Sequence, residues 1–227
     1  MNTLLSFFND VVEYWPQILA GLGNTLLLAG IVTVTGLIGG ILVFYLALSP
    51  HQRIRKITEG YISFFIGTPL IVLLFLMYYG LPQWGIRLSP LTVAVIGFTL
   101  NVAAYNARYL MSAYNGIIAC ELEAARAQGF SNLQVFRLVT LPQTLRLAVP
   151  GLTNQVILNL KDSSVAFLIQ YTEFFAQIQE LTARNFQYFK GYLLAGFVYL
   201  LLVSLILLAA RHLERRLLPC WHSMGNR

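Results

Sequence analysis

Charged side chains are scarce in this sequence. Only 11% of its 227 residues are charged, whereas 57% are apolar. About a quarter of the residues of an ordinary soluble domain are charged, so this composition excludes that class. Apolar runs long enough to cross a bilayer as helices follow one another along the chain. The sequence therefore predicts an all-α, polytopic membrane helix bundle with the lipid bilayer as its solvent.

Residues that build catalytic or metal sites are also few. The two cysteines, Cys120 and Cys220, and the three histidines have no metal-ligand spacing. No phosphate loop of the form GxxxxGK[ST] is present, and no nucleophile with its base or pair of acids stands out. We therefore expect a protein that is not an enzyme, with no metal and no cofactor of its own.

The net charge of +6 reflects where the basic residues lie. They cluster at the ends of apolar runs, as the positive-inside rule predicts, so nucleic-acid binding is not expected. We assign ten of the fifteen Lys and Arg residues to the cytoplasm, three to the outside and two to spans. This distribution predicts an external N-terminus and a cytoplasmic C-terminus. The whole chain, 1–227, is expected to form one transmembrane domain with five spans, at 18–49, 61–81, 91–116, 145–169 and 191–210.

Glycine and proline mark two special places in these spans. Gly36 and Gly40 form a GxxxG pair, which lets another helix approach closely; the alternative is a pair of isolated, permissive glycines. In the second span, Pro69 follows Thr68 and removes a backbone donor, so the helix should kink there. A broken helix at membrane depth suits either a translocation pathway or a packing kink.

The segment 121–142 is the longest interruption between apolar runs. Good helix formers continue to Gln128, and Gly129 provides a left-handed stop. Ser131 with Gln134 then has the spacing of a capping box, and a second apolar helical face runs until Pro142. The sequence predicts two short helices with a glycine corner, presented in the cytoplasm between the third and fourth spans.

The same segment resembles the EAA loop of ABC-importer membrane subunits. The matching positions are Glu123, Ala124, Ala125, Gly129, Val139, Leu141 and Pro142. In that family this loop docks as a coupling helix into a groove on a separate cytoplasmic ATPase. The resemblance implies that the ATPase-docking residues here are Glu123, Ala124, Ala125, Gly129, Leu141 and Pro142. The alternative is that Glu123 only pairs with Arg126, which contributes a few tenths of a kcal/mol.

Three further stretches resemble the polar amino-acid branch of these permeases. They are GTPLIVLLFLMYYGLP at 67–82, LNVAAY at 100–105 and KDSSVA at 161–166. The resemblance implies a permease subunit of a binding-protein-dependent ABC importer in a bacterial inner membrane, carrying a polar amino acid or related small solute. It also implies three partners: a cytoplasmic ATPase dimer that binds ATP and Mg, a second permease subunit (the same chain or a paralogue), and an extracytoplasmic binding protein. Relatives usually carry Glu at the place of Arg108.

Several spans carry polar residues that a lipid-facing helix would not. Asn101, Tyr105 and Arg108 share one helical face, and a charge in a span costs several kcal/mol unless it faces a cavity or a partner. We interpret the polar positions as a candidate substrate pathway, made of Thr68, Pro69, Asn101, Tyr105, Arg108, Gln155, Asn159, Lys161, Asp162, Ser163 and Ser164. The alternatives are an interhelical polar clamp, or pairing of Arg108 with an acid of a neighbouring subunit.

A second class of function fits part of the same pattern. Arg108, Lys161 and Asp162 could couple a stand-alone secondary transporter or channel to ions. Five spans are few for such a protein, and no inverted repeat is visible. A small membrane scaffold is a third possibility. The mixed polar and aromatic segment 171–190 is long enough for an external helix that meets a delivery protein.

Overall fold

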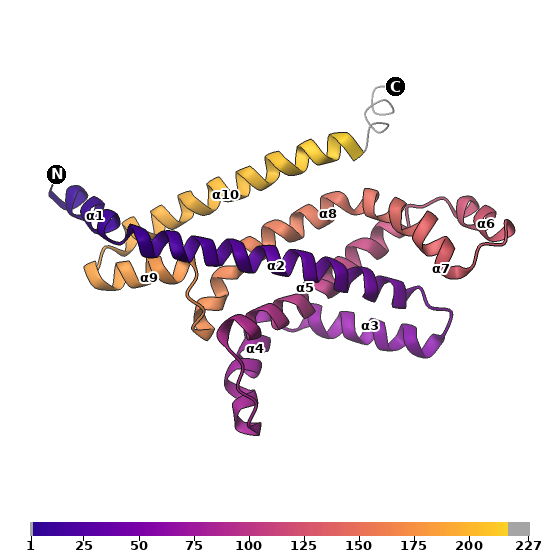
Figure 1. Cartoon of the computed structure of the whole chain (residues 1–227), viewed down its shortest axis with the longest axis horizontal. Helices are drawn as coiled ribbons and strands as arrows, with labels where there is room; N and C mark the ends of the chain where they lie inside the picture. The colour runs from indigo at the N-terminus through magenta and orange to yellow at the C-terminus, as the bar shows by residue number, and fades with distance from the viewer. Residues whose placement is uncertain (1, 218–227) are drawn as a thin grey trace. The chain divides into compact units, whose positions relative to one another are not determined.

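The computed structural model describes residues 2–217, and for residues 2–5, 119 and 213–217 the backbone alone (Figure 1). Within this range every element is helical, which confirms the all-α prediction. Cys220 and His222 lie outside the described residues. The α-helices are α1 (Asn2–Glu13), α2 (Trp15–Ala47), α3 (Gln52–Gly67), α4 (Leu70–Phe75), α5 (Pro90–Tyr114), α6 (Ala119–Ala127), α7 (Asn132–Val135), α8 (Leu141–Asp162), α9 (Phe174–Asn185) and α10 (Tyr188–Leu217). Two π-helical segments, η1 (Leu76–Gly80) and η3 (Phe136–Thr140), and two 3₁₀ segments, η2 (Leu81–Trp84) and η4 (Ser163–Ile169), complete the chain.

Three described helices are long and apolar enough to cross a bilayer, namely Trp15–Ala47, Pro90–Tyr114 and Tyr188–His212. A fourth candidate is the pair Gln52–Gly67 and Leu70–Trp84, which bends by 98° at its break. The position of the predicted kink is therefore confirmed, but the bend angle is much larger than that of a kinked helix. Pro69 has no N–H and disfavours helical backbone at Thr68, and its own backbone is extended at ψ 132°.

The helix expected to form the fourth span, 145–169, has other bounds in the structure. The α-helix begins at Leu141 and ends at Asp162, where the 3₁₀ segment η4 takes over. The hydroxyls of Ser163 and Ser164 donate to the carbonyls three residues back, at 2.7 Å and 2.8 Å. Such local bonds compete with the α-helical pattern and favour the tighter winding.

The sequence predicts that the second helix of the 121–142 segment ends at Pro142, but the helical backbone continues past this residue. The π-helical η3 leads from α7 directly into α8. Pro142 occupies the first turn of α8, a position at which a proline is tolerated. The stretch from α7 through η3 into α8 is therefore one continuous run of helical backbone.

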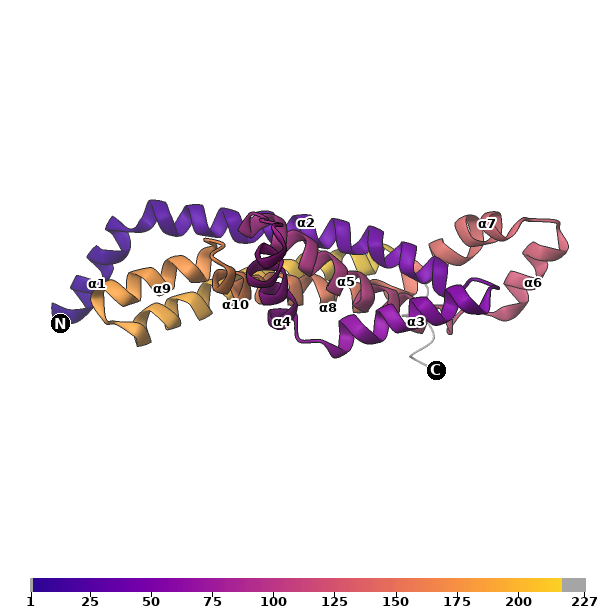
Figure 2. The same ribbon diagram turned by 90° about the horizontal axis from the view of Figure 1, so that it is seen from below.

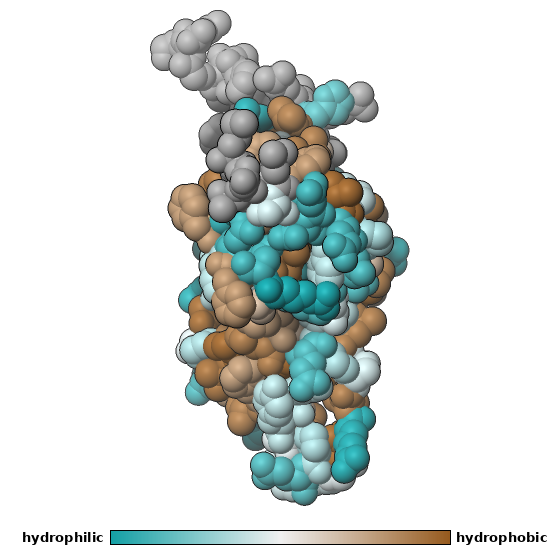
Figure 3. Space-filling view, turned by 90° about the vertical axis from the view of Figure 1, so that its left-hand side faces the viewer, coloured by the Kyte–Doolittle hydropathy of each residue, from teal (hydrophilic) through white to brown (hydrophobic). Residues whose placement is uncertain are grey.

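Backbone contacts divide the chain into two units, whose boundaries fall inside α2, α5, α8 and α10 and between α3 and α4. Unit 1 contains the chain up to Val34, Thr68–Thr99 and Val156–Ile206. Its buried cluster joins the α1–α2 junction to α9 and α10, through Tyr14, Ile18, Phe174, Ile178, Leu181 and Ala195. α1 lies beside α9, where Asn185 Nδ2 donates to Asp10 Oδ2 at 3.0 Å (Figure 2). Figure 3 views the chain from the end that carries α1 and α9 and shows hydrophilic residues over the middle of this face, with hydrophobic residues beside and below them.

Unit 2 contains Thr35–Gly67, Leu100–Gln155 and the chain from Leu207 onward. Its buried cluster draws on α2, α3, α5, η3 and α8, through Phe44, Ile62, Ala107, Leu110, Phe136 and Ala148. A Cβ added at Gly36 or at Gly40 would lie 2.5 Å from a side-chain atom of α5. The close approach predicted from the GxxxG pair is therefore confirmed.

Candidate functional site

The 119–142 segment of unit 2 is folded as the sequence predicted. Ser131 N donates to Gln134 Oε1 at 2.8 Å, and Gln134 N donates to Ser131 Oγ at 3.4 Å, which completes the capping box of α7. Gly129 has a φ of 83°, in the left-handed region that glycine adopts without strain. Figures 1 and 2 show α6 and α7 side by side on either side of this corner.

Two sets of contacts attach this segment to the rest of unit 2. Gln143 Nε2, in α8, donates to Glu121 Oε2, in α6, at 2.7 Å. Phe136 is only 8% exposed, and its ring centroid lies 5.8 Å from that of Phe44 and 4.7 Å from that of Tyr45. Because Phe44 also contacts Tyr114, an aromatic cluster joins η3 to the last turns of α2 and α5. Displacement of the segment would therefore displace these helices as well.

The six docking residues expected from the sequence occupy different environments. Glu123 and Ala124 are exposed on α6, whereas Ala125 is 6% exposed and packs inward. Gly129 forms the corner, Leu141 is half-buried and Pro142 is exposed. Among the side chains that the structure describes, ion pairs join Arg55 to Glu59 and Arg184 to Glu180, and none joins Glu123 to Arg126. The simple structural role considered for Glu123 is not observed.

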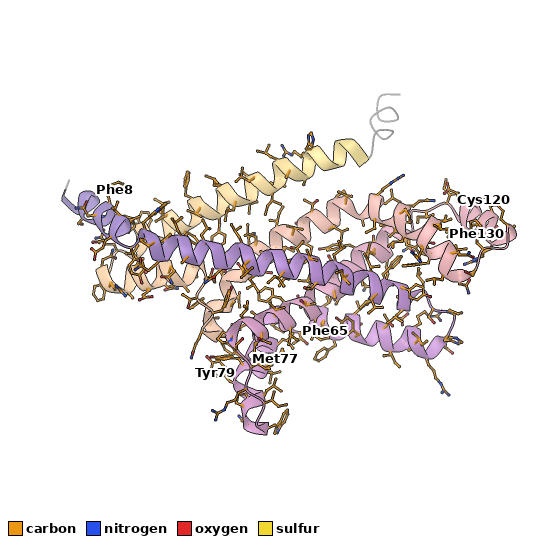
Figure 4. All side chains as sticks on the ribbon, in the orientation of Figure 1. Phe8, Phe65, Met77, Tyr79, Cys120 and Phe130 are labelled. Atoms are coloured by element: carbon orange, nitrogen blue, oxygen red, sulfur yellow. The ribbon has the colours of Figure 1, made fainter. Side chains whose placement is uncertain are left out.

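Large apolar side chains are also exposed on this segment. Phe130, Leu133 and Leu138 are 38%, 50% and 64% exposed. Figure 4 labels Phe130 and Cys120 at the α6 and α7 end of unit 2. Apolar side chains exposed on the same segment as an exposed carboxylate are typical of a surface that a partner covers. The geometry thus supports a docking surface.

The eleven candidate pathway residues divide between the units, four in unit 2 and seven in unit 1. In unit 2, Asn101 is buried, and its Nδ2 donates to the carbonyl of Phe65 at 2.9 Å, which links α5 to α3. Gln155 is buried and Tyr105 half-buried, whereas Arg108 is exposed although both of its neighbours on α5 are not. Arg108 is therefore the member of this set whose charged group is open to a ligand or partner.

In unit 1 the exposed charged members are Lys161 and Asp162, at the end of α8. Asn159 is buried, and its Nδ2 donates to Thr33 Oγ1 at 3.3 Å. Ser163 and Ser164 bond to the backbone of their own helix, as described above. Thr68 is half-buried and Pro69 is exposed at the break between α3 and α4. Several of these polar groups therefore have structural partners already.

The sequence does not indicate the structural role of Glu173. Its side chain is fully buried at the start of α9, where Oε1 accepts from Ala176 N at 2.7 Å and Oε2 from Phe175 N at 2.9 Å. Oε2 also accepts from Thr25 Oγ1 at 3.2 Å and from Tyr199 OH at 3.3 Å. Burial raises the pKa of the Glu173 carboxyl, and these hydrogen bonds oppose that rise. Glu173 therefore joins α9 to α2 and α10 in unit 1.

Comparison with known proteins decides the family. The model of the family described as "Binding-protein-dependent transport system inner membrane component" matches residues 36–219. The chain belongs to this family. It is thus a multi-pass component of an inner-membrane transport system and not an enzyme. The stand-alone transporter and the membrane scaffold lose their support.

Relatives of this permease match along nearly its whole length. The probable amino-acid ABC transporter permease protein YckA of Bacillus subtilis (strain 168) is 34% identical over 205 residues, which cover 90% of this chain and 91% of the relative. The probable amino-acid ABC transporter permease protein PatM of Vibrio harveyi is 36% identical over 195 residues, which cover 85% and 87%. A crystal structure of an amino acid ABC transporter with histidines superposes with a TM-score of 0.84 at 28% identity, covering 92% of this chain and 98% of that one. The helical permease fold is shared with that transporter.

Proposed function

We propose that this chain is the permease subunit of an ABC importer that carries a polar amino acid or a related small solute. The observation that carries the proposal is the ordered 119–142 segment, on whose surface Glu123 and several apolar side chains are exposed. Relatives described as amino-acid permeases support the cargo class. The partners are a cytoplasmic ATPase dimer that binds ATP and Mg, a second permease subunit and an extracytoplasmic binding protein.

In this proposal α6 docks into the ATPase through the exposed Glu123 and Ala124, and the buried Ala125 packs beneath them. The direction of the chain after the docking helix is determined by Gly129 at the corner and by Leu141 and Pro142 at the start of α8. Closure of the ATPase dimer moves α6 and α7 as one body, and the aromatic contacts of Phe136 pass that motion to α2 and α5. Movement of packed helices as rigid bodies is a common route to alternating access.

We also propose five spans, with the N-terminus outside and the C-terminus in the cytoplasm. The fourth of these spans in chain order is α8, whose 22 residues measure about 33 Å at about 1.5 Å per residue, enough to cross a hydrocarbon core. Its polar residues lower its mean hydropathy, which explains why it is not among the apolar candidates. Arg53, Arg55 and Lys56 at the start of α3 fit the cytoplasmic side.

We assign the substrate pathway to Thr68, Pro69, Asn101, Tyr105, Arg108, Gln155, Asn159, Lys161, Asp162, Ser163 and Ser164. Among them, the exposed guanidinium of Arg108 is best suited to hold a substrate carboxylate, because a planar donor fork matches a carboxylate in a bidentate pair. The external helix α9, held in place by Glu173, is the surface for the delivery protein.

The docking proposal is tested by Glu123→Lys in the complete importer reconstituted in proteoliposomes. Reversing an exposed charge at the docking face should reduce substrate-stimulated ATP hydrolysis at least tenfold (about 1.4 kcal/mol), while membrane insertion is unchanged. Glu59→Lys is the matched control, since Glu59 is also an exposed glutamate but pairs with Arg55 on α3. Unaltered stimulation in Glu123→Lys, or equal loss in both variants, would refute docking at α6.

A further inference from the structure

A cavity of about 470 Å³ lies in unit 2, between the end of α2, the start of α3 and the 119–142 segment. Its lining includes the polar residues Ser49, His51, Arg126 and Asn132. It also includes the aromatic residues Tyr45 and Phe136, which are called the aromatic wall below. None of the described residues that line the cavity is acidic. The lining is thus that of a site for an amphipathic molecule with a negative charge.

Several features favour an anion beside Arg126 in the cavity. Arg126 supplies a guanidinium whose fork of donors suits phosphate oxygens. His51 lies just before α3, and its backbone N–H donates to Ser49 Oγ at 3.3 Å, which fixes the chain at this point. The 16-residue α3 begins at Gln52, and the positive end of its dipole faces the same region. Arg53, Arg55 and Lys56 on its first turns add further positive potential.

Helical periodicity separates the cavity from the proposed docking face. Leu122 and Arg126 are four residues apart on α6 and line the cavity. Glu123 and Ala127, also four residues apart, are exposed beside them. A molecule in the cavity would therefore support α6 from behind and leave its outer face open.

We propose that this cavity binds the phosphate of an anionic phospholipid of the cytoplasmic leaflet, with Arg126 as the principal phosphate contact and the aromatic wall against the acyl region. The placement in the cytoplasmic leaflet rests on the function and topology proposed above; the binding chemistry does not. Free phosphate shares the recognition chemistry of the headgroup but leaves the aromatic wall unused. Occupancy holds α6 in the orientation seen here.

Native mass spectrometry of the purified full-length chain tests this proposal, with dioleoylphosphatidylglycerol, dioleoylphosphatidylcholine and inorganic phosphate as probes. The anionic lipid should bind more tightly than the zwitterionic one. Arg126→Gln should weaken the anionic lipid about tenfold, because it removes a charge-assisted contact to phosphate. Arg126→Lys keeps the charge and should lose about threefold or less. Arg137→Gln, an exposed arginine of the same segment outside the cavity lining, should change binding less than twofold.

Each outcome decides the matter. Displacement of the lipid by millimolar phosphate, dependent on Arg126, would support the site and identify free phosphate as a second source of ligand. Resistance to phosphate with the same dependence would support a lipid site alone. Equal losses in Arg126→Gln and Arg137→Gln, or equal binding of the two lipids, would overturn the proposal. Because no ATPase is present, these results are independent of the Glu123 experiment.

Discussion

Glu173 shows how one carboxylate can organise several helices in unit 1. A fully buried carboxylate is costly unless it is well hydrogen-bonded. Two bonds from the first turn of α9 and one each from Thr25 and Tyr199 meet this requirement. Phe174 N also donates to Thr25 Oγ1 at 3.0 Å, so that hydroxyl links α2 to both the side chain and the backbone of the α9 start. The position of α9 depends on this residue.

Glu173 predicts a pH dependence of stability with a defined sign. Burial raises its folded-state pKa above the unfolded value, so the group stabilises the fold most below the usual glutamate range. That contribution is lost as the pH rises through the raised pKa. The apparent melting temperature of the purified protein should therefore fall as the pH rises above the usual glutamate range. Glu173→Gln, which does not ionise and keeps an accepting oxygen, should show a shallower fall; the same slope in both proteins would rule out this role.

The features that the sequence predicts correctly at the residue scale are those that depend on local chemistry. Gly129 as a left-handed corner, Ser131 with Gln134 as a capping box and Pro69 as a helix break were all predictable, because each depends on residues within a few positions. Glu173 was not predictable in this way. Its partner Thr25 is 148 positions away along the chain, and glutamate is not among the preferred N-cap residues.

At the scale of helices, the contact between α2 and α5 depends on missing side chains. Gly40 faces Asn106, and an added Cβ would lie 2.5 Å from Asn106 Cβ and 3.3 Å from the carbonyl oxygen of Ala103. Neither α-helix can yield there without moving backbone. By contrast, Gly30 on the same helix has nothing within 4 Å of an added Cβ. Comparing substitutions at Gly40 and Gly30 therefore separates the effect of close packing from that of helix propensity.

Gly40→Ala should therefore destabilise the protein by about 1–3 kcal/mol, through overpacking between α2 and α5. Gly30→Ala should be neutral or slightly stabilising, because alanine favours a helix over glycine by about 1 kcal/mol. Thermal unfolding of both variants in the same detergent measures the difference. If Gly30→Ala lowered the melting temperature as much as Gly40→Ala, close packing at Gly40 would not be the cause.

The helix bounds that the sequence could not predict lie at both ends of α8. Its start depends on the π-helical η3, whose Phe136 is held by aromatic rings of α2. Its end depends on serine hydroxyls that turn back onto the helix. The apolar pattern alone extended the span to residue 169, because hydropathy does not distinguish α-helical from 3₁₀ backbone. Tertiary packing and side-chain bonding to the backbone set the actual limits.

At the scale of the whole molecule, membership of the family makes this chain a multi-pass inner-membrane component. The number of spans depends on whether α8 crosses the bilayer. The polar load of this helix hides it from a hydropathy criterion. The same polar load is unfavourable in lipid and is accommodated where a helix faces a pathway or another subunit. The function proposed here and the crossing of α8 are therefore linked.

Cysteine labelling of intact cells tests that crossing. In a variant with Cys120 and Cys220 replaced by serine, Arg87→Cys and Thr172→Cys should react with a membrane-impermeant maleimide from outside, since both positions are exposed. Ala127→Cys, exposed on α6, should react only after permeabilisation. Positions 127 and 172 flank α8, so opposite accessibility requires that α8 crosses the bilayer. Labelling of position 127 from outside would place the docking segment away from any cytoplasmic ATPase, whereas protection of position 172 would leave α8 on one side and reduce the bundle to four spans.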